Sequence, residues 1–281
     1  MSGESLCALS PKRFAEGIPL SFEEVPPILC KPILASNNKR NQKRFTKRTM
    51  AESFDLHAVA TGDIVGSSDL PADRRRQLPD RLRSTYETVQ QTAPEELPYE
   101  LAITGGDGWQ CYVRNPATAL ARLLHFWTLL YAQGLPSRMA LVVDTVDFVS
   151  EEDLNESDGR AFRRSGRLLS SLNGERWFDG ALPSDASEAH HVASEGIGEL
   201  VDLFFHEWTE AQARAIAGMI GTIGTEREIT QEKIAAQWTP EPVTRQAVNR
   251  HLKRAHWNRV ERTVTRFEHL CHSLQTPTLD E

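Results

Sequence analysis

Residues 101–113 read Leu101-Ala-Ile-Thr-Gly-Gly-Asp-Gly-Trp-Gln-Cys-Tyr-Val113. Apolar runs flank the glycine-rich centre, a pattern typical of a β-hairpin with a tight turn. Glycine reaches the positive φ angles of such turns and leaves no side chain to block a ligand near the backbone. The turn carries one carboxylate, Asp107. Because Asp is common in turns, this residue alone predicts no site.

A second carboxylate stands at the end of an earlier apolar run. The stretch is His57-Ala-Val-Ala-Thr-Gly-Asp-Ile-Val-Gly-Ser-Ser68, in which Asp63 precedes a Gly-Ser-Ser turn. If this strand lies beside the hairpin, Asp63 and Asp107 meet at the rim of one sheet. Two carboxylates among small residues can hold Mg²⁺ together with nucleotide phosphates. The small residues are Gly66, Ser67, Gly106 and Gly108.

Composition sets the broad class. The chain has 281 residues and 40% apolar content, enough for two domains and a tail. No apolar run approaches the roughly 18 residues that span a bilayer, so we expect no membrane contact. Charged residues interrupt the first twenty positions, so we expect no secretory signal. The four cysteines form no CxxC pair, which favours a cytoplasmic protein without zinc or disulfides.

Charge is unevenly distributed along the chain. Residues 1–49 carry nine Lys or Arg and four Glu, a net of +5, and since the whole carries −7, the remainder carries −12. An acidic body predicts that any DNA contact is local. Residues 1–49 show no sustained period and are expected to be a disordered basic tail, solvated rather than bound to nucleic acid. Met50 directly precedes the first structured segment, which suggests that translation starts there.

Residues 50–198 are expected to form one α/β domain. The predicted elements are a strand at 56–61, a helix at 71–86, the hairpin at 99–113, a helix capped by Asn115 and a strand at 138–145. This β-α-β-β-α-β order is that of a ferredoxin-like sheet with helices on one face. Residues 173–198 are expected to be strands and loops, with His190 and His191 in a surface loop.

A helix rich in arginine is predicted over residues 157–173. Its apolar stripe leaves four arginines on other faces: Arg160, Arg163, Arg164 and Arg167. These side chains either bind triphosphate oxygens as planar bidentate donors or form a solvated face with salt bridges. The residues alone favour neither triphosphate binding nor a solvated face with salt bridges.

Residues 199–275 change to a helical pattern. A helix capped by Thr209, a helix capped by Thr230 and a helix at 243–257 predict a helix-turn-helix domain, of the winged kind. Residues 225–270 carry nine Lys or Arg against six Glu, which favours DNA as the partner. The side chains expected to face DNA are Thr244, Arg245, Gln246, Asn249 and Arg250. The apolar side of residues 259–270 is a plausible dimer or docking surface.

The first half resembles the catalytic domain of class III nucleotidyl cyclases, a palm-type α/β domain. Asp63-Ile-Val-Gly-Ser-Ser68 matches the first metal motif of that family, Gly106-Asp107 matches the second, and residues 159–168 match a helix that ends in Arg-Leu. The resemblance implies Mg²⁺ or Mn²⁺ held by Asp63 and Asp107, a nucleoside triphosphate, and a homodimer. It also implies that Arg167 stabilises the transition state across the dimer interface.

This sequence departs from the cyclase pattern at two positions. Arg163 stands where the cyclases have asparagine, and Ile103 stands where a purine-selecting Lys or Glu is usual. The resemblance therefore includes the metal-binding positions. It does not extend to the position that selects the nucleobase, so it implies neither adenine nor guanine. Residues 56–270 contain, in order, Gly62-Asp-Ile-Val-Gly-Ser67, Gly106-Asp-Gly-Trp-Gln110, Asp158-Gly-x-Ala-Phe162, Trp208-Thr-x-x-Gln212, Thr230-Gln-x-x-Ile-Ala235 and Gln246-Ala-Val-x-x-x-Leu252. This order resembles that of the SatD family, which pairs a cyclase-like domain with a C-terminal helix-turn-helix.

Three functions remain open at this stage. The first is a metal-dependent nucleotidyl cyclase. Two ions held by Asp63 and Asp107 would activate the ribose 3′-hydroxyl and neutralise the leaving pyrophosphate. Arg167 and Arg163 would bind the negative charge that develops in the transition state. The second is a transcription regulator whose site binds a nucleotide without turnover. The third is a helix-turn-helix used only for protein interaction. We favour a nucleotide-site regulator with possible cyclase activity.

Overall fold

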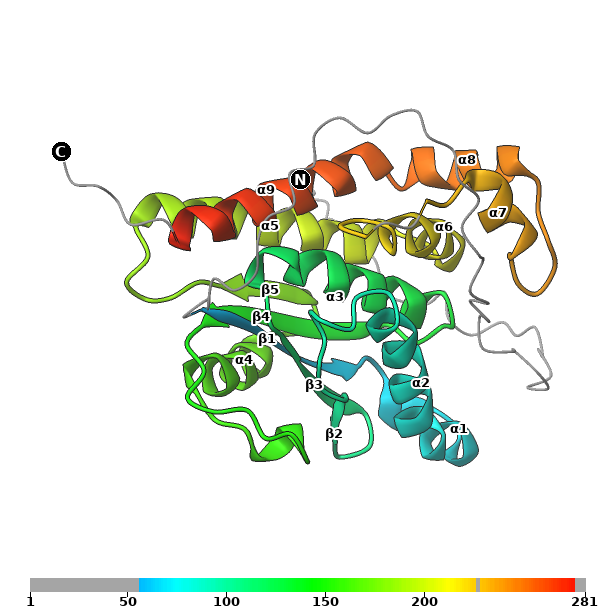
Figure 1. Ribbon diagram of the computed structural model, residues 1–281. Helices are drawn as coiled ribbons and strands as arrows, with labels where there is room; N and C mark the ends of the chain where they lie inside the picture. Colours follow the sequence, from blue (N-terminus) through cyan, green and yellow to red (C-terminus); the bar gives the residue numbers. More distant parts are fainter. Residues whose placement is uncertain (1–55, 226–227, 276–281) are drawn as a thin grey trace, which may run out of the picture.

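The computed structural model describes residues 56–225 and 228–275. The basic tail and the start at Met50 lie outside the described residues. The described chain is a mixed α/β fold built on a five-stranded sheet in the order β2-β3-β1-β4-β5 (Figure 1). The strands are β1 (His57–Ile64), β2 (Ala102–Thr104), β3 (Gly108–Val113), β4 (Ser137–Asp144) and β5 (Phe178–Ala181). β1 is antiparallel to both β3 and β4, and β5 is parallel to β4.

The predicted β-α-β-β-α-β order is confirmed within the described residues. The expected hairpin is β2 and β3, and the expected buried strand is β4. The predicted helix at 71–86 is two helices, because the first ends at Arg76, before Gln77, and the second begins at Leu78 with Pro79 in its first turn. These are α1 (Ala72–Arg76) and α2 (Leu78–Gln90), and they follow the short η1 (Ser67–Asp69).

The helices of the predicted β-α-β-β-α-β unit lie on one face of the sheet, as expected, and the later arginine-rich helix covers the other face. α3 (Pro116–Tyr131) packs on one face and α4 (Arg160–Ser171) packs on the other, against β1 and β4. Alternation along β1 explains this arrangement, because Val59 belongs to the cluster under Phe162 of α4 whereas Ala58 and Ala60 face α3. The continuous apolar run of β4 is the signature of a strand buried on both sides.

The start of α4 differs from the prediction. The helix begins at Arg160 rather than at Ser157, after η2 (Leu154–Glu156). Gly159 has φ 152°, and a Cβ there would lie 2.6 Å from Cα of Val146. The chain therefore enters the helix through a close backbone contact that only glycine permits.

The C-terminal third is helical, as expected. It holds α5 (Glu188–Glu207), α6 (Glu210–Ile220), α7 (Gln231–Ala236), α8 (Arg245–Arg254) and α9 (Trp257–Gln275). The predicted caps Thr209 and Thr230 are confirmed, as is Asn115 at the start of α3. α5 begins earlier than the sequence suggested, so His190 and His191 lie in its first turn rather than in a loop.

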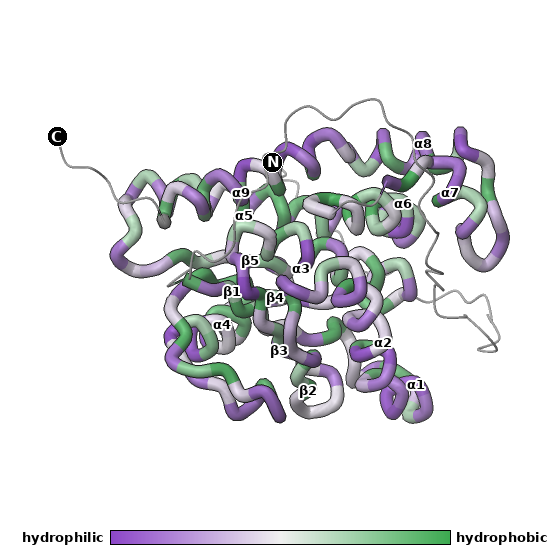
Figure 2. The backbone as a smooth tube through the Cα atoms, in the orientation of Figure 1, coloured by the Kyte–Doolittle hydropathy of each residue, from purple (hydrophilic) through white to green (hydrophobic). Residues whose placement is uncertain are grey.

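α3 lies at the centre of the molecule. It is buried at 14 of its 16 residues, because the sheet covers one side and α6 and α9 cover another. One buried apolar cluster runs from Ala58 in β1 to Cys271 in α9. Figure 2 shows the hydrophobic residues gathered along the inner strands and α3. The expected division between residues 198 and 199 falls inside α5. Among the described helices, none is both long and apolar enough to cross a bilayer.

Candidate nucleotide site at the edge of the sheet

The structure places Asp63 near the end of β1 and Asp107 in the turn directly before the neighbouring strand β3. Asp63 pairs with Gly108 in the β1–β3 register, and Ile64 N donates to the carbonyl oxygen of Asp107 at 3.3 Å. The turn between β2 and β3 contains Gly105 at φ 64° and Gly106 at φ 93°, so glycine is required there. The hairpin therefore folds as its sequence predicted, and it holds Asp107 next to the end of β1.

Ser67 links the two turns of the site. Its hydroxyl donates to the carboxylate of Asp107, and Gly66 just before it has φ 69°. A Cβ on Gly106 would meet no atom within 4 Å, so the backbone of this turn is open to a ligand. A Cβ on Gly108 would lie 2.9 Å from the carbonyl oxygen of Thr104, which shows how tightly the hairpin closes. Of the four small residues named from the sequence, Ser67, Gly106 and Gly108 thus adjoin the carboxylates, and Gly66 directly precedes Ser67.

Arg138 is the residue of this site that the sequence analysis missed. Its guanidinium donates to both oxygens of Asp63, with Nε to Oδ1 at 3.0 Å and Nη2 to Oδ2 at 2.5 Å. The hydrogen bond to Asp63 raises the pKa of Arg138, against the opposing effect of burial. Its Nη1 also donates to the carbonyl oxygen of Leu172, just after α4, at 3.1 Å. Arg138 therefore ties Asp63 to the end of α4.

A signal for Arg138 exists in the sequence. It is the first charged residue of the apolar run that became β4, and antiparallel pairing places the start of β4 beside the end of β1.

A second missed group is a polar cluster on the same face. Thr61 Oγ1 lies 2.7 Å from Ser165 Oγ and accepts from Gln110 Nε2 at 2.8 Å.

Within one chain, the predicted catalytic arginines are not brought to the carboxylates. Arg163 pairs with Asp147 at 3.3 Å and Asp158 at 2.5 Å, in the first turn of α4. That turn lies at the end of the sheet away from Asp63, since Ala161 N donates to Thr145 just after β4. Arg167 is exposed, two residues after Ser165, which contacts the sheet. Its supply to a partner copy stays a prediction.

Three of the four arginines of α4 form ion pairs within the chain. This agrees with the interpretation of the helix as a face with salt bridges. Arg160 and Arg164 both pair with the fully buried Asp144. A buried carboxylate needs such partners, because an unpaired charge costs several kcal/mol to bury. Three of the four arginines are thus occupied within the chain.

A divalent ion is the cofactor that the motifs imply. The residues present fit an ion that is bound jointly by the two carboxylates and a substrate phosphate. Mg²⁺ is commonly bound by one or two carboxylates together with substrate phosphates and water, which suits Asp63 and Asp107. The described residues contain no group of three or more His, Cys, Asp and Glu side chains arranged to hold a metal ion by themselves. Arg138 occupies both oxygens of Asp63, although each carboxylate oxygen has a second lone pair. The donor set fits an ion shared with a phosphate.

The predicted DNA-contacting side chains lie around the start of α8. Thr244, Arg245, Gln246 and Arg250 are exposed and Asn249 is half-buried. Thr244 caps the helix, accepting from Ala247 N at 3.2 Å. The expected inner residues Ile234, Ala235, Val248 and Leu252 are buried. Residues 237–244 between α7 and α8 form a longer connection than the three or four residues of a usual helix-turn-helix, so that motif stays a prediction.

Comparison with protein-family models and with curated proteins gives no match. Two solved structures show partial likeness. The crystal structure of the guanylyl cyclase Cya2 has 13% identity and a TM-score of 0.31 over 44% of this chain and 74% of that chain. The crystal structure of the adenylyl cyclase CyaB from P. aeruginosa has 18% identity and a TM-score of 0.29 over 42% of this chain and 72% of that chain. Both TM-scores are too low to assign a function.

Proposed function

We propose that the sheet edge at Asp63 and Asp107 binds a nucleoside triphosphate with Mg²⁺ or Mn²⁺ and acts as a nucleotidyl-cyclase-like site. The observation that carries this proposal is the pairing of Asp63 with Gly108, which sets Asp63 on β1 beside the glycine-containing turn that carries Asp107. Phosphate groups bind to exposed backbone N–H groups of turns of this kind. A divalent ion binds to carboxylate oxygens such as those of Asp63 and Asp107.

Each residue has a stated part in the proposed site. Asp63 and Asp107 would hold the ion, which would neutralise phosphate charge when bound. Ser67 orients Asp107 by its hydrogen bond, and the open turn at Gly106 leaves room for phosphate oxygens. Arg138 is a positioning residue, since its two bonds fix the carboxylate of Asp63. Arg167 is exposed and available to a second copy of the chain, as the proposed homodimer requires.

The alternative is a site that binds a nucleotide without turnover. The bidentate contact of Arg138 favours it, because a guanidinium on both oxygens of Asp63 competes with an ion for that carboxylate. A regulator of this kind needs only different affinities of its states for the nucleotide.

Incubation with ATP, GTP, CTP and UTP in turn, with Mn²⁺ or Mg²⁺, tests both forms. We expect Asp107→Ala to lower formation of cyclic product at least about 100-fold, because it removes a metal ligand. Mass spectrometry identifies the product, and nucleotide binding is measured by calorimetry. Asp73→Ala is the matched control, since Asp73 is an exposed carboxylate on α1 that pairs with Arg76.

The outcomes separate the two forms. A product lost only in Asp107→Ala establishes the cyclase and names its base. Metal-dependent binding without product, lost in the same variant, establishes the sensor. If wild type and Asp107→Ala bind nucleotide equally, the proposed site is wrong.

The second candidate function is DNA binding through α8, which would make the chain a transcription regulator. The exposed Arg245, Gln246 and Arg250 favour it, because these side chain types can contact base edges and phosphates. Arg245 already pairs with Glu232 at 3.2 Å, an exposed contact that DNA could replace. If α8 serves only protein interaction, wild type will bind no duplex.

We expect Arg245→Ala to weaken binding to a promoter fragment about 5- to 100-fold, the range for one lost base or phosphate contact. Fluorescence anisotropy in a salt titration measures the effect. Equal affinity of variant and wild type across the titration would contradict the role of α8.

A further inference from the structure

A concentration of positive charge covers the outer side of α8 and α9. Residues 245–266 carry seven Lys or Arg and one acidic residue, Glu261, in a chain whose net charge is −7. All seven are exposed. Arg245 pairs with Glu232, and the other six form what we term the basic face: Arg250, Lys253, Arg254, Arg259, Arg262 and Arg266. The positive excess of this segment therefore extends over two consecutive helices.

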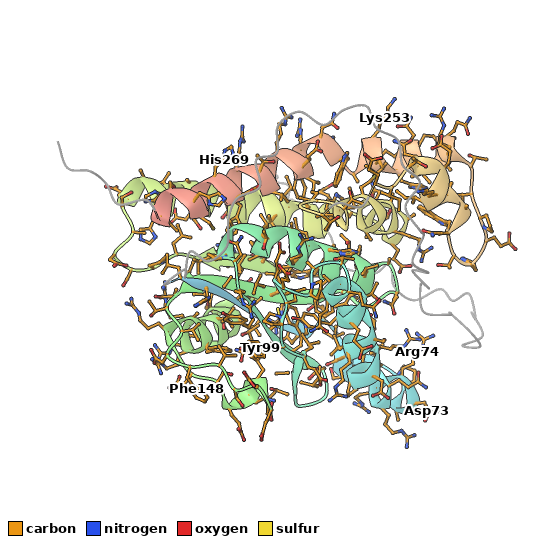
Figure 3. The ribbon with its side chains drawn as sticks, viewed as in Figure 1. Asp73, Arg74, Tyr99, Phe148, Lys253 and His269 are labelled. Atoms are coloured by element: carbon orange, nitrogen blue, oxygen red, sulfur yellow. The ribbon has the colours of Figure 1, made fainter. Side chains whose placement is uncertain are left out.

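The inner sides of the same helices are apolar and buried. Val248 and Leu252 of α8 are at most 3% exposed, and Val260, Val264 and Phe267 of α9 are at most 4% exposed. Packing thus fixes which side of each helix meets solvent, and the cations occupy that side. In Figure 3 the labelled Lys253 and His269 both project from this outer side.

The basic face is not neutralised from within the described chain. Its six cations form no ion pair among residues 56–225 and 228–275, whereas three arginines of α4 pair with Asp144, Asp147 or Asp158. Arg250 and Arg254 are four residues apart, as are Arg262 and Arg266, a spacing at which like charges repel on a helix. Burial lowers the pKa of His251, and the charges of Arg254 and Arg250 lower it further. A bound polyanion would relieve this repulsion.

The shape of the basic face favours duplex DNA over a membrane. α8 and α9 follow one another along one side of the molecule (Figure 1), and within α9 Arg259 to Arg266 spans about 10 Å of helix, or roughly three base pairs. Helices that lie on membranes insert large apolar side chains. The large apolar residues exposed in the described chain are Phe148, Val192 and Leu203, and none of them is on α8 or α9.

We propose that the basic face of α8 and α9 binds the phosphate backbone of duplex DNA without regard to sequence. This inference rests on the proposed DNA-binding role of α8 and extends its contact surface along α9. The start of α8 would read bases, and Arg259, Arg262 and Arg266 would hold the duplex in register by phosphate contacts.

The test compares two triple variants of the full chain on a 20-base-pair duplex by fluorescence anisotropy. The first is Arg259→Gln/Arg262→Gln/Arg266→Gln, which removes three cations of the basic face. The matched control is Arg76→Gln/Arg83→Gln/Arg114→Gln, which removes three exposed cations elsewhere and changes the net charge equally. Circular dichroism and thermal melting check that both variants fold, as expected for exposed positions.

We expect the α9 variant to lose affinity on the order of 100-fold at 0.15 M salt, for duplexes of any sequence. The slope of log affinity against log salt should fall by about 2.7, because three phosphate contacts are lost. The control should keep the slope of wild type. Equal slopes in wild type and the α9 variant, or an equal loss in both variants, would overturn the inference.

Further measurements separate phosphate binding by the basic face from base reading by the start of α8. If Arg245→Ala binds as wild type does while the α9 variant is weak, the basic face is established and base reading by α8 is wrong. Wild type that binds no duplex at 0.05 M salt overturns both. Binding to phosphatidylserine vesicles without binding to duplex DNA would also overturn the inference and identify a lipid surface.

Discussion

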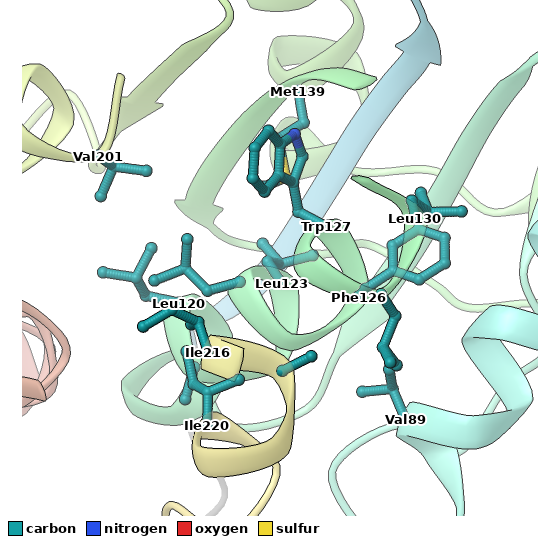
Figure 4. Close-up of a cluster of buried hydrophobic side chains, with 14 of the residues drawn as sticks. Val89, Leu120, Leu123, Phe126, Trp127, Leu130, Met139, Val201, Ile216 and Ile220 are labelled. Carbon is teal, nitrogen blue, oxygen red and sulfur yellow. The ribbon is translucent and has the colours of Figure 1, made fainter. Parts of the chain in front are cut away.

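Replacing Trp127 with alanine is expected to lower the free energy of unfolding by about 4 kcal/mol, the largest stability effect that we expect from a single residue. Trp127 is fully buried in α3, and its ring stacks on Phe205 of α5 with centroids 3.8 Å apart. Its side chain lies among buried hydrophobic residues (Figure 4), and its Nε1 donates to the carbonyl oxygen of Ser137, at the start of β4, at 2.7 Å. The variant loses apolar burial, one ring contact and one buried hydrogen bond together.

The same variant tests whether the chain unfolds as one unit. Because Trp127 joins the sheet to α5, we expect urea unfolding to stay a single transition with a lower midpoint and an unchanged slope. Leu203→Ala is the control, since Leu203 lies on α5 and is 50% exposed, and it should change stability by less than about 0.5 kcal/mol. A loss below about 1 kcal/mol in Trp127→Ala, or two separate transitions in wild type, would contradict this account.

Gly62→Ala is expected to destabilise the protein by about 3 kcal/mol, although it adds one methyl group. A Cβ at residue 62 would lie 2.3 Å from Cζ2 of Trp109 and 2.5 Å from the carbonyl oxygen of Arg138. The indole lies over the glycine and donates from Nε1 to Ser137 Oγ at 3.0 Å, so it cannot move without losing that bond. Ser137 Oγ in turn donates to the carbonyl oxygen of Asp63 at 2.7 Å. The methyl group would thus disturb the strand that carries Asp63.

Gly196→Ala is the matched control for Gly62→Ala. Gly196 lies inside α5, and a Cβ there would meet no atom within 4 Å. Alanine is a better helix former than glycine, so this variant should gain roughly 0.5–1 kcal/mol. Urea unfolding with a constant slope measures both changes. Equal stability of Gly62→Ala and wild type would show that the contacts around residue 62 relax freely.

The sequence predicted those features that depend on residues a few positions apart. The caps Asn115, Thr209 and Thr230 were correct, because a cap bonds to a backbone N–H two or three residues away. The hairpin was correct because Gly105 and Gly106 permit positive φ angles. The adjacency of Asp63 and Asp107 followed from the β-α-β-β-α-β order once the strands were placed.

The sequence analysis failed where the outcome depended on distant partners. Arg138 bonds to Asp63 across 75 positions, and only the β1–β4 register brings the two side chains together. The face on which α4 packs could not be read from its own apolar stripe, because a helix of that period can cover either side of a sheet. The early start of α5 was hidden by the polar residues of its first turns.

What the sequence by itself determined is the β-α-β-β-α-β order, the helix caps and the glycine turn that carries Asp107. Periodicity, turn chemistry and capping act over a few residues, so they can be read without coordinates. What only the tertiary structure decided is which charges are paired. Arg163 is held by Asp147 and Asp158 and Asp63 is held by Arg138, whereas the basic face has no such partner in the described chain. Ion pairing depends on distances of a few ångströms between elements far apart in sequence, and packing alone sets those distances.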